Sequence, residues 1–391
     1  MDRRRFLRTA GLTGAGVVVA GGAAAAYRAS NVGLFPSDPS PFEAWDALEG
    51  QKPGAAEGLL AAAILASNPH NTQPWRLGAD ETLFVVEADP NRHLGAFDPF
   101  RREMWIGLGG AVACAEVAAP GLGFRLGEPQ VVQTGPAGAG RIEAAISRVD
   151  PTPHPLASGL SARRTNRASY DPAPVPLETL QQVLSLAGEA PGVRLAIHPR
   201  DSDAGQAFAA ATVSATEAIN GDAEMSGDGH RWFRHNPRDV ARHRDGVAVA
   251  TSGLSPVMSA LGQMLPPMDA ATAGGYWLDS TRRQVEGAGG FGWMLVDDLD
   301  DRNAQLAVGR LWQRLHLALT GAGLAGHPLN QLPEMVDRDR QLGRSGPWAA
   351  QAAALAPEGG RLTFGFRFGG PLREVPHSAR RQLDAVRLQA T

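Results

Sequence analysis

The segment SNPHNTQPWR, residues 67–76, is the stretch around which the rest of the chain is organised. It follows an alanine- and leucine-rich stretch typical of a helix and precedes one typical of a strand. Because proline fixes φ and moves the preceding residue out of the helical region, Pro69 and Pro74 exclude a continuous helix. The four polar residues between them can donate and accept hydrogen bonds, which suits the edge of a flat heteroaromatic ligand. A polar turn whose amides satisfy nearby backbone groups is the alternative.

The composition is that of an ordinary globular protein. The chain has 391 residues, of which 43% are apolar and 20% charged, so it is long enough to bury a core. A formal net charge of -3 gives no electrostatic reason to expect a nucleic-acid partner. Cys114 is the only cysteine, which excludes an intrachain disulfide, and no Cys/His group has zinc-ligand spacing. We therefore expect no metal site.

Residues 1–30 are predicted to be a twin-arginine signal peptide. Arg3 and Arg4 precede Phe6 and Leu7, and a Gly/Ala/Val run follows over residues 11–26. This run is shorter than the ~20 residues that span a bilayer, so we expect no stable membrane span in the mature form; a permanent anchor is the alternative. The prediction is an exported, periplasmic or otherwise extracytoplasmic protein that uses the twin-arginine export machinery and folds with its cofactor before export.

Periodicity predicts the main elements and one domain boundary. Helices are expected over residues 57–66, 103–118, 177–186, 204–219 and 303–320, and strands over 75–77, 82–87, 193–198 and 362–368. Gly107, Gly109 and Gly110 weaken their helix and indicate close approach of another helix or of a cofactor edge. Residues 245–267 are rich in loop formers, contain several methionines and are expected to form a mobile cover over a pocket. Prolines at 151–155 mark the boundary.

Residues 163–167 crowd three arginines and a threonine into five positions. Arg163, Arg164 and Arg167 repel one another unless an anion neutralises them. Guanidinium forks and the Thr165 hydroxyl are groups that bind phosphate. A solvated basic turn is the alternative.

Together these segments resemble the flavin-binding nitroreductase superfamily, in particular its exported Acg-like branch, in which one chain carries both halves of what is elsewhere a homodimer. The resemblance rests on HNTQPW at 70–75, Asp98-Pro99 with Arg102, RRTNR at 163–167, Gly323-Leu324 ahead of Pro328, and Arg380-Arg381. It implies an α+β fold of two fused nitroreductase-like halves, residues 31–150 and 151–391, that form an intrachain pseudo-dimer.

The resemblance also implies FMN as the cofactor. The residues expected at the FMN phosphate are Arg163, Arg164, Thr165, Arg167 and one of Arg380 and Arg381. Those expected at the ring and ribityl chain are Asn68, His70, Asn71 and Gln73, and a backbone N–H near Asn330 and Gln331 is expected to face the ring. The chain departs from the family where Ala66-Ser67-Asn68 replaces Ala-Pro-Ser. No second copy of the loop is present, so one FMN per chain is expected.

The implied activity is that of an FMN-dependent oxidoreductase that takes electrons from a small-molecule donor and reduces a nitro compound, quinone or similar acceptor by two electrons. No catalytic side chain is required, because the cofactor supplies the redox chemistry. A flavin-sequestering or storage protein and a binding module that has lost the cofactor are the alternatives. NAD(P)H is not supplied outside the cytoplasmic membrane, and no Gly-x-Gly-x-x-Gly follows a strand. We therefore expect slow or absent reduction by NAD(P)H and ready reduction by dithionite.

Overall fold

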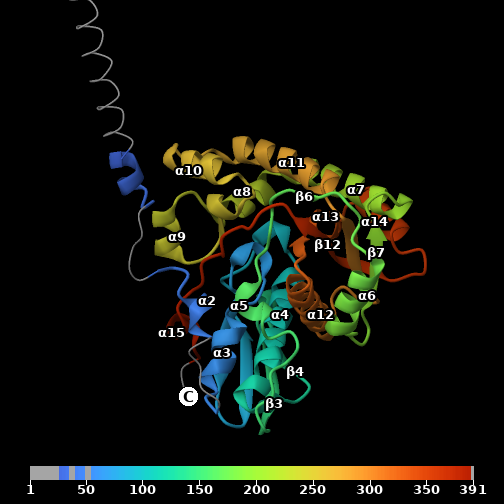
Figure 1. The fold of residues 1–391 in the computed structure, drawn as a ribbon. Coiled ribbons are helices and arrows are strands. Elements are labelled where there is room, and N and C mark those ends of the chain that lie inside the picture. The colour runs from blue at the N-terminus through green and yellow to red at the C-terminus, as the bar shows by residue number, and fades with distance from the viewer. Residues whose placement is uncertain (1–25, 35–39, 49–53, 389–391) are drawn as a thin grey trace, which may run out of the picture.

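The computed structural model describes residues 26–34, 40–48 and 54–388 (Figure 1). The predicted export signal rests on Arg3, Arg4 and the apolar run that follows them. These residues, up to residue 25, lie outside the described residues. Within the described ranges, no helix is both long enough and apolar enough to cross a membrane. The fold mixes helices and antiparallel strands, so the expected α+β class is confirmed.

The first sheet is built from residues before Asp150. Its strands run in the order β1 (Trp75–Ala79), β2 (Leu83–Ala88), β5 (Gly140–Arg148) and β3 (Phe124–Leu126), and β4 (Gln130–Thr134) also pairs with β5. All pairs are antiparallel, and β1 and β2, which cover the first two predicted strands, form a hairpin. Phe84, Val86 and Ile142 are buried on the face that packs against α3 (Glu57–Ala63) and α4 (Arg102–Ala118).

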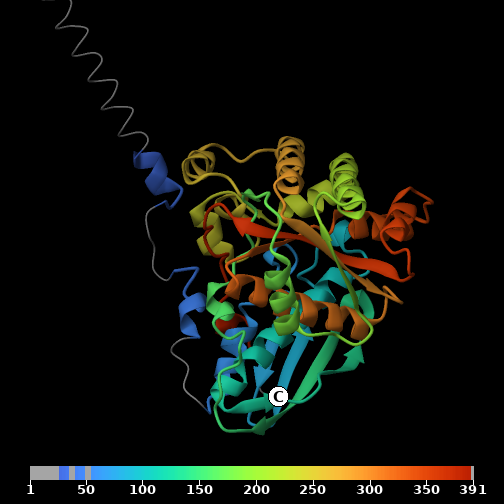
Figure 2. The ribbon, with the colours of Figure 1, turned by 45° about the vertical axis from the view of Figure 1, so that its right-hand side comes forward.

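The second sheet lies between two layers of helices. Its strand order is β11 (Ala325–Pro328), β12 (Arg361–Pro371), β10 (Gly290–Val296) and β7 (Arg194–Pro199), with β6 (Tyr170–Asp171) paired to β12. Phe364 and Phe366 pack on Trp312 of α12 (Arg302–Gly321). Trp293 points to the opposite side and stacks on Phe208 of α7 (Asp203–Gly221). Figure 2 shows this arrangement, with the red strand β12 above the orange helix α12.

Helices α4 and α12 cross at glycines, and this crossing joins the two sheets. A Cβ on Gly309 would lie 1.9 Å from the carbonyl oxygen of Ile106, and one on Gly109 would lie 2.3 Å from that of Leu306. The predicted close helix approach is thus confirmed for Gly109. Gly107 instead gives room to Pro69 and Asn68, and Gly110 to the backbone of Ser67. These glycines therefore hold the 67–69 segment directly against α4.

The remaining helices do not form one layer. They are α2 (Ala44–Ala47), α5 (Gly159–Ala162), α6 (Leu177–Ala187), α8 (Ala223–Arg231), α9 (Pro237–His243), α10 (Pro256–Met264), α11 (Ala270–Glu286), α13 (Gln331–Leu342), α14 (Trp348–Ala354) and α15 (Leu383–Val386). Helices α10 and α11 lie with α7 above the second sheet, whereas α2, α5 and α15 lie lower, beside the first sheet (Figure 1). Two short strands, β8 (Phe233–Arg234) and β9 (Val247–Ala248), pair in parallel.

Residues 245–267 are loop-rich as predicted, but Pro256 opens α10 inside them, and the Ser255 hydroxyl accepts the Met258 N–H as a helix cap. One prediction of local structure is wrong in part. The helix predicted over residues 57–66 ends at Ala63. Carbonyl groups of the next three residues, 64–66, accept hydrogen bonds from the Arg380 side chain.

The C-terminal tail returns to the first sheet. The N–H of Leu388 donates to the carbonyl of Leu77 at 2.8 Å, and Arg387 forms a bridge with the same residue. His377 stacks on Trp45 with ring centroids 4.1 Å apart. Asp150 thus separates the residues of the two sheets, whereas the tail crosses that division.

Candidate functional site

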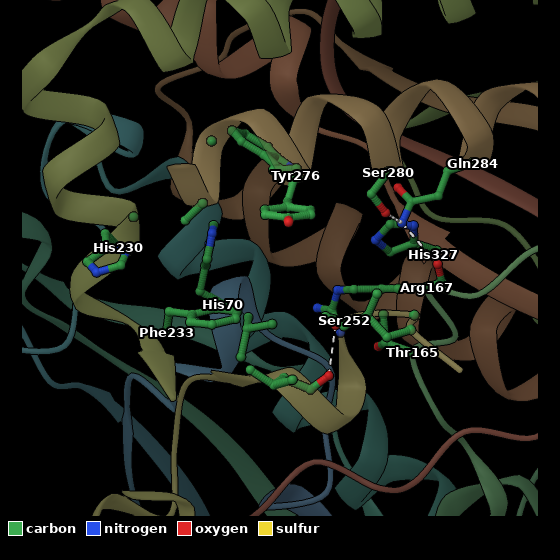
Figure 3. Close-up of a pocket in the computed structure, with 18 of the residues that line it drawn as sticks. His70, Thr165, Arg167, His230, Phe233, Ser252, Tyr276, Ser280, Gln284 and His327 are labelled. Atoms are coloured by element: carbon green, nitrogen blue, oxygen red, sulfur yellow. Dashed lines mark hydrogen bonds between the residues drawn. The ribbon is translucent and has the colours of Figure 1, made fainter. Parts of the chain in front are cut away.

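A cavity of about 1030 Å³ opens between residues 67–70, the first turns of α4, strand β11 and the layer of α8, α10 and α11 (Figure 3). Its volume of about 1030 Å³ lies just above the range of about 300–1,000 Å³ that is usual for small-molecule sites. Aromatic side chains supply much of its wall: Phe97, Phe233, Tyr276, Trp277, Trp312 and Phe364. The cavity therefore suits a flat, largely apolar ligand.

A small polar pocket adjoins this cavity. It is lined by the residues Trp45, Ser67, Asn68, Asn71, Arg163, Arg164, Thr165, Arg167, Ser378 and Arg380. Ser67, Asn68, Thr165 and Arg167 line both spaces. One elongated ligand could therefore place a charged end in the pocket and an apolar end in the cavity.

Arg163 and Arg380 are buried, and backbone carbonyls hold them in place. Arg163 Nη2 donates to Leu65 O at 2.7 Å, and Arg380 Nε donates to Ile64 O at 2.7 Å. Both guanidinium groups lie over the ring of Trp45, at 5.5 and 4.8 Å from its centroid. These contacts satisfy N–H groups of Arg163 and Arg380. The carbonyl oxygens and the Trp45 ring carry no formal negative charge that would balance the two cations.

No carboxylate of the described residues pairs with the arginines of this pocket. The remaining two donate to carbonyls as well, Arg164 to Ala162 O at 3.1 Å and Arg167 to Thr251 O at 3.3 Å. Burial lowers the pKa of Arg163 to about 10 and that of Arg167 to about 10, and it also lowers the pKa of Arg380. The Nε of Arg163 is buried and has no hydrogen-bond partner among the residues that the structure describes. Buried cations without a counter-charge indicate a binding site for an anion.

The loop 68–73 is held in an unusual backbone conformation by its own polar side chains. His70, Asn71 and Gln73 all have positive φ, at 45°, 55° and 50°. Asn68 Oδ1 accepts the Gln73 N–H at 2.7 Å. Asn71 Oδ1 accepts from Arg380 Nη1 at 2.8 Å, and its amide nitrogen donates to Ala379 O at 3.0 Å. Asn71 thus lines the small pocket and also ties the loop to the tail.

Gln73 does not reach either space, which differs from its expected role at the ring. It is fully buried, donates to Arg244 O at 2.7 Å and accepts the Arg381 N–H at 2.8 Å. Both the nitrogen and the oxygen of its side-chain amide therefore have hydrogen-bond partners within the protein. Arg381 also lies outside both spaces, and its Nη2 donates to Ala385 O. Of Arg380 and Arg381, one of which was predicted to contact the phosphate, Arg380 is therefore the one that lines the small polar pocket.

Two of the four histidines that line the cavity, His70 and His327, are neutral. Burial, followed by the charge of Arg167, lowers the pKa of His70 to about 4, and its ring meets Phe97 edge-on at 5.5 Å. Burial and the charge of Arg367 lower the pKa of His327 well below its usual value. Arg367 Nε donates to His327 Nδ1 at 3.3 Å, so the neutral ring carries its proton on Nε2. His327 was not predicted; an isolated histidine in a short strand gives no local signal.

The cavity contains the other predicted residues and several unpredicted ones. Asn68, His70, Thr165, Arg167, Asn330 and Gln331 all line it. Asn330 Oδ1 accepts the Gly365 N–H at 2.9 Å, which fixes the start of α13. Glu103, Gln284 and Glu334 were not predicted to line it. The sequence feature that could have identified Glu103 is a carboxylate in the first turn of a helix that is otherwise mostly apolar.

Comparison with known proteins points to nitroreductases over part of the chain. No family model matches it. The chain is 32% identical over 123 residues to two proteins of Mycobacterium tuberculosis, strains CDC 1551 and H37Rv, that are provisionally named NAD(P)H nitroreductases. The match covers 30% of this chain and 35% of each relative, so the chain spans about a third of the length of these relatives.

Solved structures overlap the chain at low similarity. One is the FMN-dependent nitroreductase NfnB of Mycobacterium smegmatis in complex with NADPH, with a TM-score of 0.39 and 20% identity over 60% of this chain and 98% of that chain. Another is a nitroreductase with bound FMN from Bacteroides fragilis, with a TM-score of 0.31 and 16% identity over 57% of this chain and 94% of that chain.

Proposed function

We propose that this protein binds one FMN and is an oxidoreductase of nitroreductase type, which reduces a nitro compound, a quinone or a similar acceptor by two electrons. The observation that carries the proposal is a group of four arginines, of which Arg163 and Arg380 are buried, that have no carboxylate partner among the described residues and that adjoin a large aromatic-walled cavity. The similarity of 123 residues to two proteins named as nitroreductases supports it.

The residues of the two spaces fit the two ends of FMN. Arg163, Arg164, Arg167 and Arg380 with Thr165 would hold the dianionic phosphate, because guanidinium groups bind phosphate by paired, charge-assisted hydrogen bonds. The aromatic walls would enclose the ring, with Asn68, His70, His327 and Asn330 at its polar edge. When bound, FMN supplies the two-electron chemistry. The chain itself positions the ring and shields it from water.

Further parts of the proposal concern the architecture, the location and the electron donor. We propose that the two sheets, joined where α4 crosses α12, are the fused halves of an intrachain pseudo-dimer of the Acg-like type. We also propose twin-arginine export of the folded protein.

The M. tuberculosis relatives are named for NAD(P)H. An exported enzyme meets little of either nucleotide, so we propose a different small molecule as the electron donor.

The first test is the flavin itself. The purified protein is expected to be yellow, with about one FMN per chain released by acid and identified by mass.

Arg164→Ala with Arg167→Ala should weaken FMN binding by two to four orders of magnitude, because each charge-assisted bond contributes ~1.5–3 kcal/mol. These two arginines are chosen because Arg163 and Arg380 also hold the backbone of residues 64–66. Arg148→Ala with Arg194→Ala, at exposed ion pairs elsewhere, is the matched control. Full flavin retention in the first double variant would refute the phosphate assignment.

Anaerobic stopped-flow reduction then tests turnover. We expect ready reduction by dithionite, slow or absent reduction by NADPH, and reoxidation by a quinone or nitro compound. Rapid, saturable reduction by NADPH would contradict the proposed donor. Reduced flavin that no acceptor reoxidises would instead favour a sequestering protein.

A further inference from the structure

Helix α10 turns large apolar side chains outward and polar side chains inward. Ser259 and Gln263 are buried, and Gln263 Nε2 donates to the carbonyl oxygen and the hydroxyl oxygen of Ser259 at 3.0 and 3.1 Å. Five large apolar residues on or directly beside α10 are instead 37–69% exposed: Leu254, Val257, Met258, Leu261 and Leu265. This is the reverse of the usual pattern of a surface helix, which buries its apolar side. We call these five residues the aliphatic stripe.

Hydrogen bonds at the C-terminal end of α10 fix the direction in which the stripe points. Arg28 Nε donates to the carbonyl oxygen of Met264 at 2.9 Å, and His235 Nε2 lies 2.7 Å from that of Leu265. Together with the buried pair of Ser259 and Gln263, these contacts hold the polar side of the helix against the protein. The outward direction of the aliphatic stripe is therefore set by the contacts of the helix with the rest of the fold.

Most of the aliphatic stripe belongs to the wall of the large cavity. The stripe residues that line the cavity are Leu254, Met258, Leu261 and Leu265. Because these side chains are accessible and also form part of the cavity wall, a molecule in the cavity can contact them. Val257 does not line the cavity and is 69% exposed, so the stripe continues to the outer surface. This position favours a ligand of the cavity, and not a second protein, as the molecule that covers the stripe.

The segment around the stripe carries no charge. Residues 246–268 contain no Asp, Glu, Lys, Arg or His. Met264 and Met268 add flexible thioether side chains to the same cavity wall, and such side chains adapt to irregular apolar shapes. A charged part of a ligand would find no charged partner in this segment. Unbranched and branched aliphatic side chains without charge suit a flexible hydrocarbon chain, whereas the aromatic walls elsewhere in the cavity suit a flat ring.

We propose that the aliphatic stripe binds a flexible hydrocarbon chain of a ligand whose flat head group lies in the aromatic part of the cavity, as in an alkyl-substituted quinone. The phosphate end of FMN would occupy the small polar pocket, so a cavity of about 1030 Å³ has room for such a head group beside the flavin ring. Covering the stripe with a hydrocarbon chain removes apolar surface of both from water, which strengthens binding. The inference rests on the proposed function only for the role of the head group as electron acceptor.

The test measures how affinity depends on chain length. The probes are trimethylbenzoquinone and its derivatives with a propyl or a pentyl chain at the remaining ring position. Binding to the purified, oxidised protein without reductant is followed by quenching of tryptophan fluorescence, because Trp277 and Trp312 line the cavity. Complete burial of one methylene group strengthens binding about fourfold. With partial burial of the chain, we expect the pentyl compound to bind about a hundredfold more tightly than trimethylbenzoquinone, with the propyl compound between them.

Met258→Gln with Leu261→Gln is the decisive variant. Both side chains are more than half exposed, so the polar replacements leave the hydrophobic core intact. The ratio of the pentyl affinity to the trimethylbenzoquinone affinity should fall about tenfold or more, because the chain then meets polar side chains. Leu177→Gln with Leu342→Gln is the matched control, since both leucines are exposed and lie outside the cavity. The ratio in this control should equal that of the wild type.

Several results would overturn the inference. They are a wild-type affinity that does not rise with chain length, an unchanged ratio in the double variant of Met258 and Leu261, and loss of flavin in that variant, since the stripe would then hold the cofactor. Sedimentation tests a second copy as the occupant: a wild-type dimer that the same variant converts to a monomer would overturn the inference as well. The flavin absorbance of each sample separates the two proposals. A chain-length preference that depends on Met258 and Leu261 in a protein unable to bind FMN would support the aliphatic stripe and refute the proposed cofactor.

Discussion

At the scale of single residues, His70 makes stability depend on pH. Its side chain is partly buried beside Arg167, and its pKa in the folded protein is lowered from 6.5 to about 4. Between these two pH values the unfolded chain binds a proton that the folded chain does not. The associated stability is therefore fully present above pH 6.5 and is lost as the pH falls toward 4, by up to ~1.4 kcal/mol per pH unit.

The prediction is that His70→Asn reduces the dependence of the free energy of unfolding on pH between pH 6.5 and 4. Asparagine tolerates the positive φ of position 70 and does not titrate. Urea unfolding at pH 7, 6 and 5 should show a smaller loss of stability in His70→Asn than in the wild type. His243→Asn, on the exposed end of α9, is the control. Parallel curves for His70→Asn and the wild type would show that the histidine is not the titrating group.

Arg102 illustrates how a motif residue can be structural. It belongs to the pattern on which the family resemblance rests, yet it lies outside both spaces and its Nε donates to Asp337 at 2.7 Å. Asp98, from the same pattern, accepts the N–H groups of Glu103 and Met104 at the start of α4. These two residues orient α4, and α4 in turn supplies Glu103 and Gly107 to the cavity wall.

At the scale of elements, the crossing of α4 and α12 depends on glycine. Gly309→Ala would place a Cβ 1.9 Å from the Ile106 carbonyl, which the rigid helix backbone cannot avoid. We expect a loss of at least ~1–3 kcal/mol, the usual cost of overpacking. Thermal and urea unfolding measure it.

Gly275→Ala is the control of opposite sign. Gly275 lies inside α11, and a Cβ there meets nothing within 4 Å. The substitution should stabilise the protein by ~0.5–1 kcal/mol through helix propensity. Equal effects of the two substitutions would mean that close packing at Gly309 does not matter.

At the scale of the whole molecule, the C-terminal tail closes the small pocket. It carries Arg380, which bonds the 64–66 carbonyls, and His377, which stacks on Trp45. A chain that ends at Val375 should lose several kcal/mol of stability, since charge-assisted bonds contribute ~1.5–3 kcal/mol each. It should also fail to retain FMN after gel filtration. A chain that ends at Leu388 keeps all these contacts and should behave as the full chain does. Flavin retention by the shorter chain would show that Arg380 is dispensable for the phosphate site.

Export is the second prediction at this scale. Changing Arg3 and Arg4 to lysine should leave folded, yellow protein in the cytoplasm, because the twin-arginine route reads that pair. Fractionation of cells with an antibody and a flavin spectrum measures the outcome. If the lysine variant is exported like the wild type, the signal assignment fails.

The sequence by itself determined the local features of this protein. Proline at 69 and 74 interrupts the helix before the loop, alternation marks β12, and helical spacing marks α12, since each depends on neighbouring residues only. The arginine cluster and the loop were also identified from their chemistry, and they do line one pocket. The similarity over 123 residues to two proteins provisionally named nitroreductases agrees with the resemblance drawn from these motifs.

Tertiary structure alone decided which polar groups face a ligand and which are used by the protein. Gln73 was expected at the ring or ribityl chain, but both polar atoms of its side-chain amide form long-range hydrogen bonds, with the backbones of Arg244 and Arg381. Asn71 meets Arg380 across 309 positions of sequence. Glu103 meets Glu334 because α4 and α13 start at the same cavity wall. Such pairings depend on how distant elements pack and on which hydrogen bonds burial leaves unmade, and neither leaves a local pattern in the chain.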